Sequence, residues 1–186
     1  MKLTTRTQIS YTNTVKVGEI KLSKSLTELA QNAYDKLSNE DKSKSNITFR
    51  IKFTDVFGTE GNRPRGNLTY FINGDTNPNT ARLINNDYYE ITIAPGTKVS
   101  IKGIPVLTKY TIEEVKNTEG LDYKVDEIIS SNIDPDIDEN DGNVSGVIDS
   151  GKIDSTSYTN TIKAGKIAIL KVDKDDNSIK LRGVTF

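Results

Sequence analysis

The chain has 186 residues and contains no cysteine, no histidine and no tryptophan. Without cysteine there are no disulfide bonds, thiolate metal sites, cysteine nucleophiles or thioesters within this chain. Without histidine there are no Ser-His-Asp or Cys-His triads and no imidazole metal ligands. No paired-carboxylate cleft can be inferred from the sequence either. An enzyme that acts on an external substrate is therefore the least expected class of function.

An excess of one charge and a long apolar run are also missing. The 25 basic residues nearly balance the 26 acidic residues, for a formal net charge of −1. With no basic surplus, we expect no nucleic-acid partner. No apolar run approaches the length of a membrane span, and the polar residues that follow residues 1–5 do not fit a signal peptide. If the protein works outside the cell, its export and anchoring signals lie beyond this chain.

A ten-residue stretch occurs twice. Residues 158–167 repeat residues 11–20 with seven identical positions, at an offset of 147 residues. This offset is a plausible length for one domain. The repeat predicts a tandem array: residues 1–17 are the last strand of a preceding repeat, residues 18–163 are one complete domain, and residues 164–186 begin a following repeat.

Most of the complete unit has the pattern of short β-strands. Threonine, asparagine, isoleucine, valine and tyrosine are plentiful, which favours strands joined by polar turns. Residues 47–53 alternate most clearly, with isoleucine and phenylalanine at every second position. Many such segments, with turn signals every 8 to 12 residues, predict an antiparallel β-sandwich or a partly open barrel.

One segment has helical spacing instead. Between residues 26 and 37 the apolar side chains fall on one helical face, and Ser25 or Thr27 is available as the N-cap. We expect one short helix here that packs on its own domain. Residues 39–46 are charged and polar, and we expect a loop.

Three strands carry a polar residue where alternation demands an apolar one: Lys24, Glu114 and Asn160. Burying such groups is costly unless they are paired, so their occurrence at the start, middle and end of one unit suggests that they meet. Each also has a simpler explanation. Lys24 can extend to solvent from a strand end, Glu114 can lie at the surface if Glu113 faces inward, and Asn160 can bond an edge backbone.

If the three residues meet, they can react. Removal from water disfavours charge, so burial favours a neutral Lys24 amine and a protonated Glu114 carboxyl group. A neutral amine is a nucleophile. A protonated Glu114 can donate a hydrogen bond to the Asn160 carboxamide oxygen and carry a proton to the departing ammonia. The product is an amide between two side chains, formed once per molecule without a cofactor or metal.

Five segments together carry a resemblance to a known family: residues 18–24, 91–105, 109–114, 158–161 and 165–175. In this order they resemble the collagen-adhesin B-type domains (CnaB-like or SpaA-like pilin repeats) of Gram-positive surface proteins. The resemblance implies a mainly β, antiparallel immunoglobulin-like sandwich with a self-formed Lys–Asn isopeptide bond.

By this resemblance, Lys24 is the amine, Glu114 the catalytic acid and Asn160 the acceptor. The last segment looks like the first strand of another pilin-type repeat. Asn13 and Lys171 are then the equivalent residues of the two incomplete repeats, and neither has its partner within this chain.

The expected function is that of a stalk or spacer repeat in a bacterial cell-surface adhesin or pilin, outside the cell and at the cell wall. Its partners are then the neighbouring repeats of the same polypeptide. The alternative is an adhesin module whose loops bind a host extracellular-matrix protein or a glycan, since loops on sandwich scaffolds commonly carry binding function.

An acidic stretch invites comparison with a calcium loop. Asp134, Asp136 and Asp138 have the carboxylate spacing of an EF-hand. However, Glu139 stands where that loop needs glycine, and Ser145 stands where it needs glutamate. The mismatch favours a solvated loop, and we expect no metal site.

Overall fold

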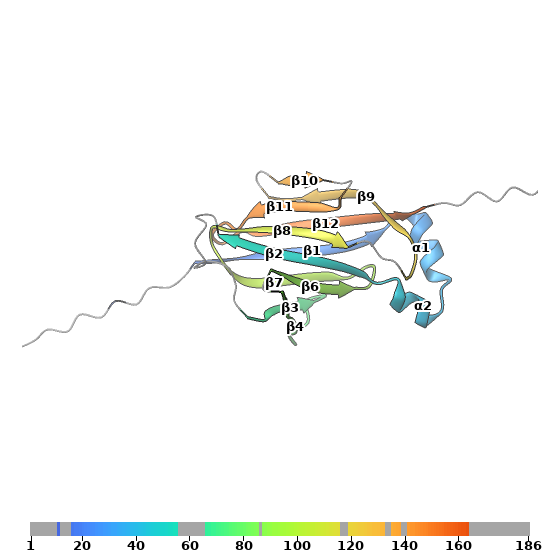
Figure 1. Cartoon of the computed structure of the whole chain (residues 1–186), viewed down its shortest axis with the longest axis horizontal. Helices are drawn as coiled ribbons and strands as arrows, with labels where there is room; N and C mark the ends of the chain where they lie inside the picture. Colours follow the sequence, from blue (N-terminus) through green and yellow to red (C-terminus); the bar gives the residue numbers. More distant parts are fainter. Residues whose placement is uncertain are drawn as a thin grey trace, which may run out of the picture.

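The computed structural model describes residue 11 and residues 16–55, 66–85, 87–115, 119–132, 135–138 and 141–163. Within these residues, twelve strands form two six-stranded sheets that pack face to face (Figure 1). The predicted β-sandwich is therefore confirmed, and of the two architectures expected from the strand pattern it is the sandwich that forms.

The first sheet contains the first and last strands of the domain. Its order is β4 (Asn79–Ala81), β3 (Leu68–Ile72), β7 (Lys98–Pro105), β1 (Val17–Leu26), β12 (Ile153–Ile162) and β9 (Tyr123–Ser130). The order of the second sheet is β10 (Asp136–Asp138), β11 (Asn143–Val147), β8 (Thr108–Val115), β2 (Ile47–Asp55), β6 (Tyr88–Ile93) and β5 (Leu83–Ile84).

Strands β1 and β12 lie side by side at the centre of the first sheet and run parallel, with Lys24 paired to Tyr158 and Leu26 to Asn160. The other strand pairs of the described residues are antiparallel. Because β1 and β12 run in the same direction, the chain enters β1 at one end of the sandwich and leaves β12 at the other (Figure 1).

The core forms from the inward positions of the alternating strands. On β2, the predicted inward residues Ile47, Phe49, Ile51 and Phe53 are all buried. The Phe49 ring packs against Tyr158 of the opposite sheet with 5.0 Å between ring centroids. Strand periodicity thus places these apolar side chains between the sheets, where their removal from water stabilises the fold.

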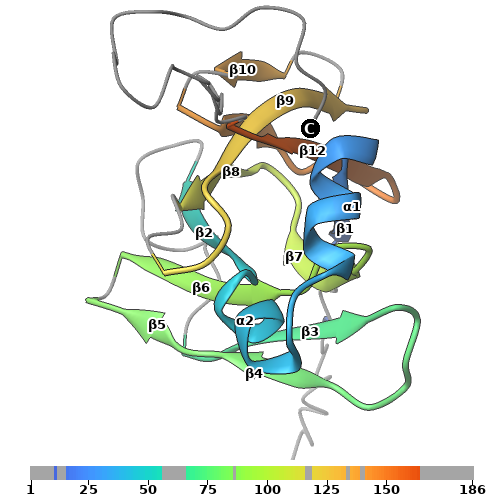
Figure 2. The ribbon, with the colours of Figure 1, turned by 90° about the vertical axis from the view of Figure 1, so that its right-hand side faces the viewer.

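The predicted helix is present as α1 (Glu28–Asp35). Thr27 is its N-cap, and its side chain accepts a hydrogen bond from the Ala30 amide. Ala30 is fully buried, and α1 contacts β1 and β12. In Figure 2 the helix lies across the end of the sandwich where β12 terminates. It therefore covers that end of the core.

The loop expected at residues 39–46 was wrong, because α2 (Asn39–Lys44) forms there. Ser38 caps this helix by accepting a hydrogen bond from the Asp41 amide, and Lys44 pairs with Glu40 one turn away. None of its residues is buried, so it has no apolar periodicity to detect, and capping and local ion pairing stabilise it instead. No helix of the described residues is long and apolar enough to cross a membrane.

Candidate functional site

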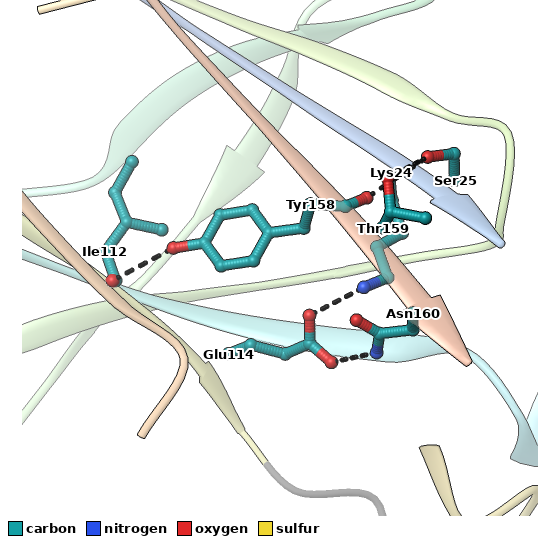
Figure 3. Close-up of polar contacts among 7 residues, drawn as sticks. All are labelled: Lys24, Ser25, Ile112, Glu114, Tyr158, Thr159 and Asn160. Carbon is teal, nitrogen blue, oxygen red and sulfur yellow. Dashed lines mark hydrogen bonds and ion pairs between the residues drawn. The ribbon is translucent and has the colours of Figure 1, made fainter. Parts of the chain in front are cut away.

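The three polar residues singled out in the sequence come together inside the sandwich (Figure 3). Lys24 comes from β1 and Asn160 from β12, which are neighbours in the first sheet. Glu114 comes from β8 in the opposite sheet. The site therefore spans the gap between the two sheets.

Glu114 bridges the other two side chains. Lys24 Nζ donates a hydrogen bond to Glu114 Oε2 at 2.7 Å, and Asn160 Nδ2 donates to Glu114 Oε1. Figure 3 shows the amine and the carboxamide meeting the two oxygens of one carboxylate. A single acid is thus in contact with both the amine and the nitrogen of the carboxamide.

The site is shielded from water. Lys24 is 2% exposed, Asn160 is fully buried, and the Glu114 side chain is 7% exposed. The Lys24 ammonium lies 5.7 Å from the centre of the Tyr158 ring. Lys24 therefore does not extend to solvent, and Asn160 does not lie on an edge strand, because β12 is flanked by β1 and β9.

Burial changes the acidity of the amine. Desolvation lowers the pKa of Lys24 from 10.5 to about 8, and the charge and hydrogen bond of Glu114 oppose this effect. A lysine with a lowered pKa loses its proton more readily. Because the acceptor Glu114 is already hydrogen-bonded to Nζ, the proton has a direct route away from the nucleophile.

The contact between Glu114 and Asn160 differs from the one expected. The expected hydrogen bond runs from Glu114 to the carboxamide oxygen, whereas in the structure Glu114 accepts one from the carboxamide nitrogen. The reason is that a carboxylate is an acceptor, and the NH₂ is the donor side of the amide. As a result, Asn160 Oδ1 is buried without a hydrogen-bond partner among the described residues.

Helix α1 is tied directly to the strand that carries Asn160. The Thr27 amide donates to the Asn160 backbone carbonyl at 2.8 Å, and the Thr27 hydroxyl donates to the Thr161 hydroxyl at 3.1 Å. The N-cap of α1 is thus bonded to the backbone of the proposed acceptor residue. This arrangement closes the site at the end of the sandwich and holds the Asn160 backbone in place.

Comparison with known protein families identifies the domain. A family described as a domain of unknown function (DUF7601) matches residues 18–162. The chain belongs to the DUF7601 family. A search of curated protein sequences found no match.

Solved structures show the fold of this DUF7601 domain. A variant of the pilus-presented adhesin Spy0125 (Cpa) matches with a TM-score of 0.50 and 14% identity, over 81% of this chain and 28% of the adhesin. The major pilin of Streptococcus pyogenes matches with a TM-score of 0.51 and 15% identity, over 79% of this chain and 48% of the pilin. This chain thus spans less than half of the adhesin and less than half of the pilin. The expected likeness to pilin-type repeat domains is confirmed at the level of the fold.

One residue of the site in this DUF7601 domain was not singled out from the sequence as functional. Tyr158 lies two residues before Asn160 on the same face of β12, and it donates a hydrogen bond to the Ile112 carbonyl at 3.2 Å. The Lys24 amine lies over the face of the Tyr158 ring. The alternation of β12 marks it as an inward residue, but only the pairing of β1 with β12 brings it next to the lysine.

Of the remaining predicted residues, those that the structure describes are not at this site. Asn13, Lys171 and Asp134 lie outside the described residues. Asp136 and Asp138 are exposed on β10. Among the residues that the structure describes, no group of three or more side chains is arranged to hold a metal ion.

Proposed function

We propose that this chain is a stalk or spacer repeat of a bacterial cell-surface adhesin or pilin, and that its complete unit, residues 18–163, is closed by an amide bond between Lys24 and Asn160. The observation that carries the proposal is the buried contact in which Glu114 bridges the lysine amine and the asparagine carboxamide. Such a contact is costly to bury, and it contains a nucleophile, a proton carrier and an acceptor carbon.

The reaction begins with proton transfer. Lys24 gives one proton to Glu114 along their hydrogen bond, which leaves a neutral amine and a protonated carboxyl group. The lowered pKa of Lys24 favours this step. The amine lone pair then attacks Cγ of Asn160, and the electron pair of the C=O bond moves onto Oδ1.

Glu114 then moves the protons that the reaction requires. It donates its proton to Asn160 Nδ2, with which it is already in contact, and takes one from the attacking nitrogen. The C–Nδ2 bond breaks, ammonia leaves and the C=O bond re-forms. The products are a Lys24–Asn160 amide, one ammonia molecule and a protonated Glu114. The reaction occurs once per molecule and turns over no external substrate.

The tie would change how the domain bears force. The chain enters β1 and leaves β12 at opposite ends of the sandwich (Figure 1). A bond between Lys24 and Asn160 closes a loop of 136 residues (160 minus 24). Tension applied at the two ends then passes through the bond, and the strands between these residues are not pulled apart. Treated like a disulfide, the closed loop stabilises the domain by roughly 4–5 kcal/mol.

The fold likeness supports this assignment, because the matched structures are a pilus-presented adhesin and a major pilin. The repeated stretches at residues 11–20 and 158–167 support neighbouring repeats of the same polypeptide as partners. An extracellular position on the bacterial surface follows from this role. The chain spans less than half of the adhesin and less than half of the pilin. The ligands and partners of the whole protein are therefore proposals as well.

Intact-mass spectrometry of the whole chain tests the bond. We expect a mass about 17 Da below the sequence mass, which corresponds to the loss of one ammonia in amide formation. We expect one loss and not two, because Asn13 and Lys171 are proposed to belong to the two incomplete repeats. The variants Lys24→Ala and Asn160→Ala should keep the full mass and lose resistance to protease. A wild-type chain at full mass contradicts the proposal.

A groove on the outer face of the first sheet favours a second candidate function, the binding of a host extracellular-matrix protein or glycan. The groove has a volume of about 1030 Å³ and crosses β7, β1, β12 and β9. Its lining is rich in serine hydroxyl groups, from Ser23, Ser100, Ser130, Ser131, Ser155 and Ser157. Screening the chain on arrays of glycans and matrix proteins tests this role, with Ser157→Trp as the variant that fills the groove. If wild type and Ser157→Trp bind equally well, the groove is not the binding site.

A further inference from the structure

Two buried polar atoms near the site lack hydrogen-bond partners among the described residues: the hydroxyl of Tyr123 and Oδ1 of Asn160. One is a donor and the other an acceptor. Leaving either group without a partner in the interior is energetically costly. A buried polar group without a partner therefore needs a specific explanation, and a role in catalysis is one such explanation.

The two residues lie on neighbouring strands of one sheet. In the antiparallel pairing of β9 with β12, Tyr123 is opposite Ile162 and Asn160 is opposite Val125. Tyr123 is therefore the diagonal neighbour of Asn160, and both side chains face the interior. Diagonal neighbours are about 7–8 Å apart, within reach of an aromatic side chain.

The electrostatic surroundings of Tyr123 agree with this arrangement. Burial raises the pKa of Tyr123 to about 12, with further contributions from Tyr34 and Glu114. The phenol thus interacts electrostatically with Glu114, the carboxylate that accepts the hydrogen bond from the Asn160 nitrogen. A raised pKa also keeps the hydroxyl protonated and able to donate at neutral pH.

The proposed amide formation needs a donor at Oδ1, because the oxygen gains negative charge when Lys24 attacks. Glu114 is bonded to the nitrogen side of the carboxamide, and the Tyr158 hydroxyl is bonded to the Ile112 carbonyl. We propose that the Tyr123 hydroxyl is the oxyanion donor of the reaction, a role that rests on the proposed function. It donates a hydrogen bond to Oδ1 as the carbon becomes tetrahedral, and the bond relaxes when the C=O group re-forms.

In this step Tyr123 keeps its proton. The electron pair that moves onto Oδ1 returns to the carbon when ammonia leaves, and all proton transfers pass through Glu114. The two atoms that have no partner within the described ranges in the ground state are thus paired with each other in the transition state. An interaction made only in the transition state accelerates the chemical step, and donors of this kind contribute about 10²- to 10³-fold in rate.

The rate of ammonia loss tests the proposal. The full chain is synthesised in a cell-free system and quenched in acid at intervals, and the fraction of molecules that have lost about 17 Da is followed by intact mass. We expect Tyr123→Phe to slow the loss about 10- to 100-fold. The matched control is Tyr34→Phe, which removes the hydroxyl of the half-buried tyrosine that influences the Tyr123 pKa, and its rate should stay within about twofold of wild type.

A stability measurement separates a chemical role from a structural one. In a Lys24→Met background no bond forms. Adding Tyr123→Phe should then leave the melting temperature unchanged or raised, because it removes a buried hydroxyl that has no partner among the residues the structure describes. A slower reaction with a lowered melting temperature indicates a structural role and overturns the proposal.

The outcomes also separate this inference from the proposed function. If wild type loses ammonia and Tyr123→Phe reacts at the same rate, the Tyr123 role is wrong and the isopeptide bond stands. If wild type never loses ammonia, the proposed function fails and the Tyr123 role fails with it.

Discussion

Strands β8 and β12 each contribute to two buried polar clusters, at different levels of the sandwich. The amine cluster contains Lys24, Glu114 and Asn160. The tyrosine cluster contains Tyr110 of β8, Asp154 of β12 and Asn132 from the segment after β9. The two clusters are four residues apart on β8 and six residues apart on β12. They therefore test what determines whether a buried polar group reacts or only holds the fold.

The tyrosine cluster is a hydrogen-bond network. Asn132 Nδ2 donates to the Tyr110 hydroxyl at 3.3 Å and to Asp154 Oδ2 at 3.2 Å. Burial raises the pKa of Tyr110 to about 12 and also raises the pKa of Asp154. Every buried side-chain polar atom of these three residues has a hydrogen-bond partner.

The difference between the clusters that decides their reactivity lies in their chemistry. Both contain a carboxyl group and a carboxamide, but only the amine cluster contains a nitrogen nucleophile beside the carboxamide. Only in the amine cluster is a buried carboxamide oxygen without a partner among the described residues. A complete network stabilises one arrangement, whereas an incomplete network with a nucleophile is ready to react.

The largest expected effect comes from removing the nucleophile. Lys24→Met keeps an unbranched side chain but prevents the amide bond, and it leaves Glu114 without its cation. We expect a loss of at least about 5 kcal/mol in the free energy of unfolding, measured by denaturant titration. The control Lys52→Met removes a half-exposed lysine that pairs with Asp87, and it should change stability by less than about 1 kcal/mol. Similar losses in the two variants would show that no covalent tie exists.

An intermediate effect is expected from disrupting the tyrosine cluster alone. Gly146→Ala adds a Cβ that collides with the Asn132 amide and the Tyr110 ring and hydroxyl. We expect a loss of about 2–3 kcal/mol from overpacking and broken hydrogen bonds. The loss of about 17 Da should remain complete in this variant. A Gly146→Ala protein that keeps its ammonia would mean that the two clusters are not independent.

The smallest effect is a pH dependence that appears only without the bond. In Asn160→Ala, Lys24 remains a free amine with its pKa lowered to about 8 from 10.5. Between these values the unfolded chain binds more protons than the folded one, so stability rises with pH across this window. We expect a gain on the order of 2 kcal/mol between pH 8 and pH 10.

The control for this titration is the double variant Lys24→Met/Asn160→Ala, which has the same tyrosines but no amine at the site. The difference in stability between the two proteins should change with pH only through Lys24. If it is constant from pH 8 to pH 10, the buried lysine does not have the lowered pKa. Wild type with the bond formed should also lack this component, because an amide nitrogen does not titrate.

The elements that could be predicted from the sequence are those whose structure follows from local periodicity. The inward residues of β2 follow from alternation, and α1 follows from helical spacing with the Thr27 cap. Helix α2 was missed because it buries no side chain. The parallel pairing of β1 with β12 was also missed, because pairing between strands more than 100 residues apart leaves no local pattern in either strand.

For the site, the sequence by itself determined which residues stand out. Lys24, Glu114 and Asn160 break the apolar alternation of their strands, and the cost of burying them predicts that they meet. Only the tertiary structure decided how they meet. It turned the nitrogen of Asn160 toward Glu114 and left Oδ1 without a partner in the described part of the chain. It also placed Tyr123 on the neighbouring strand as the diagonal neighbour of Asn160. The physical reason is that periodicity determines which face of a strand a residue occupies, whereas strand register and side-chain packing determine which atoms come into contact.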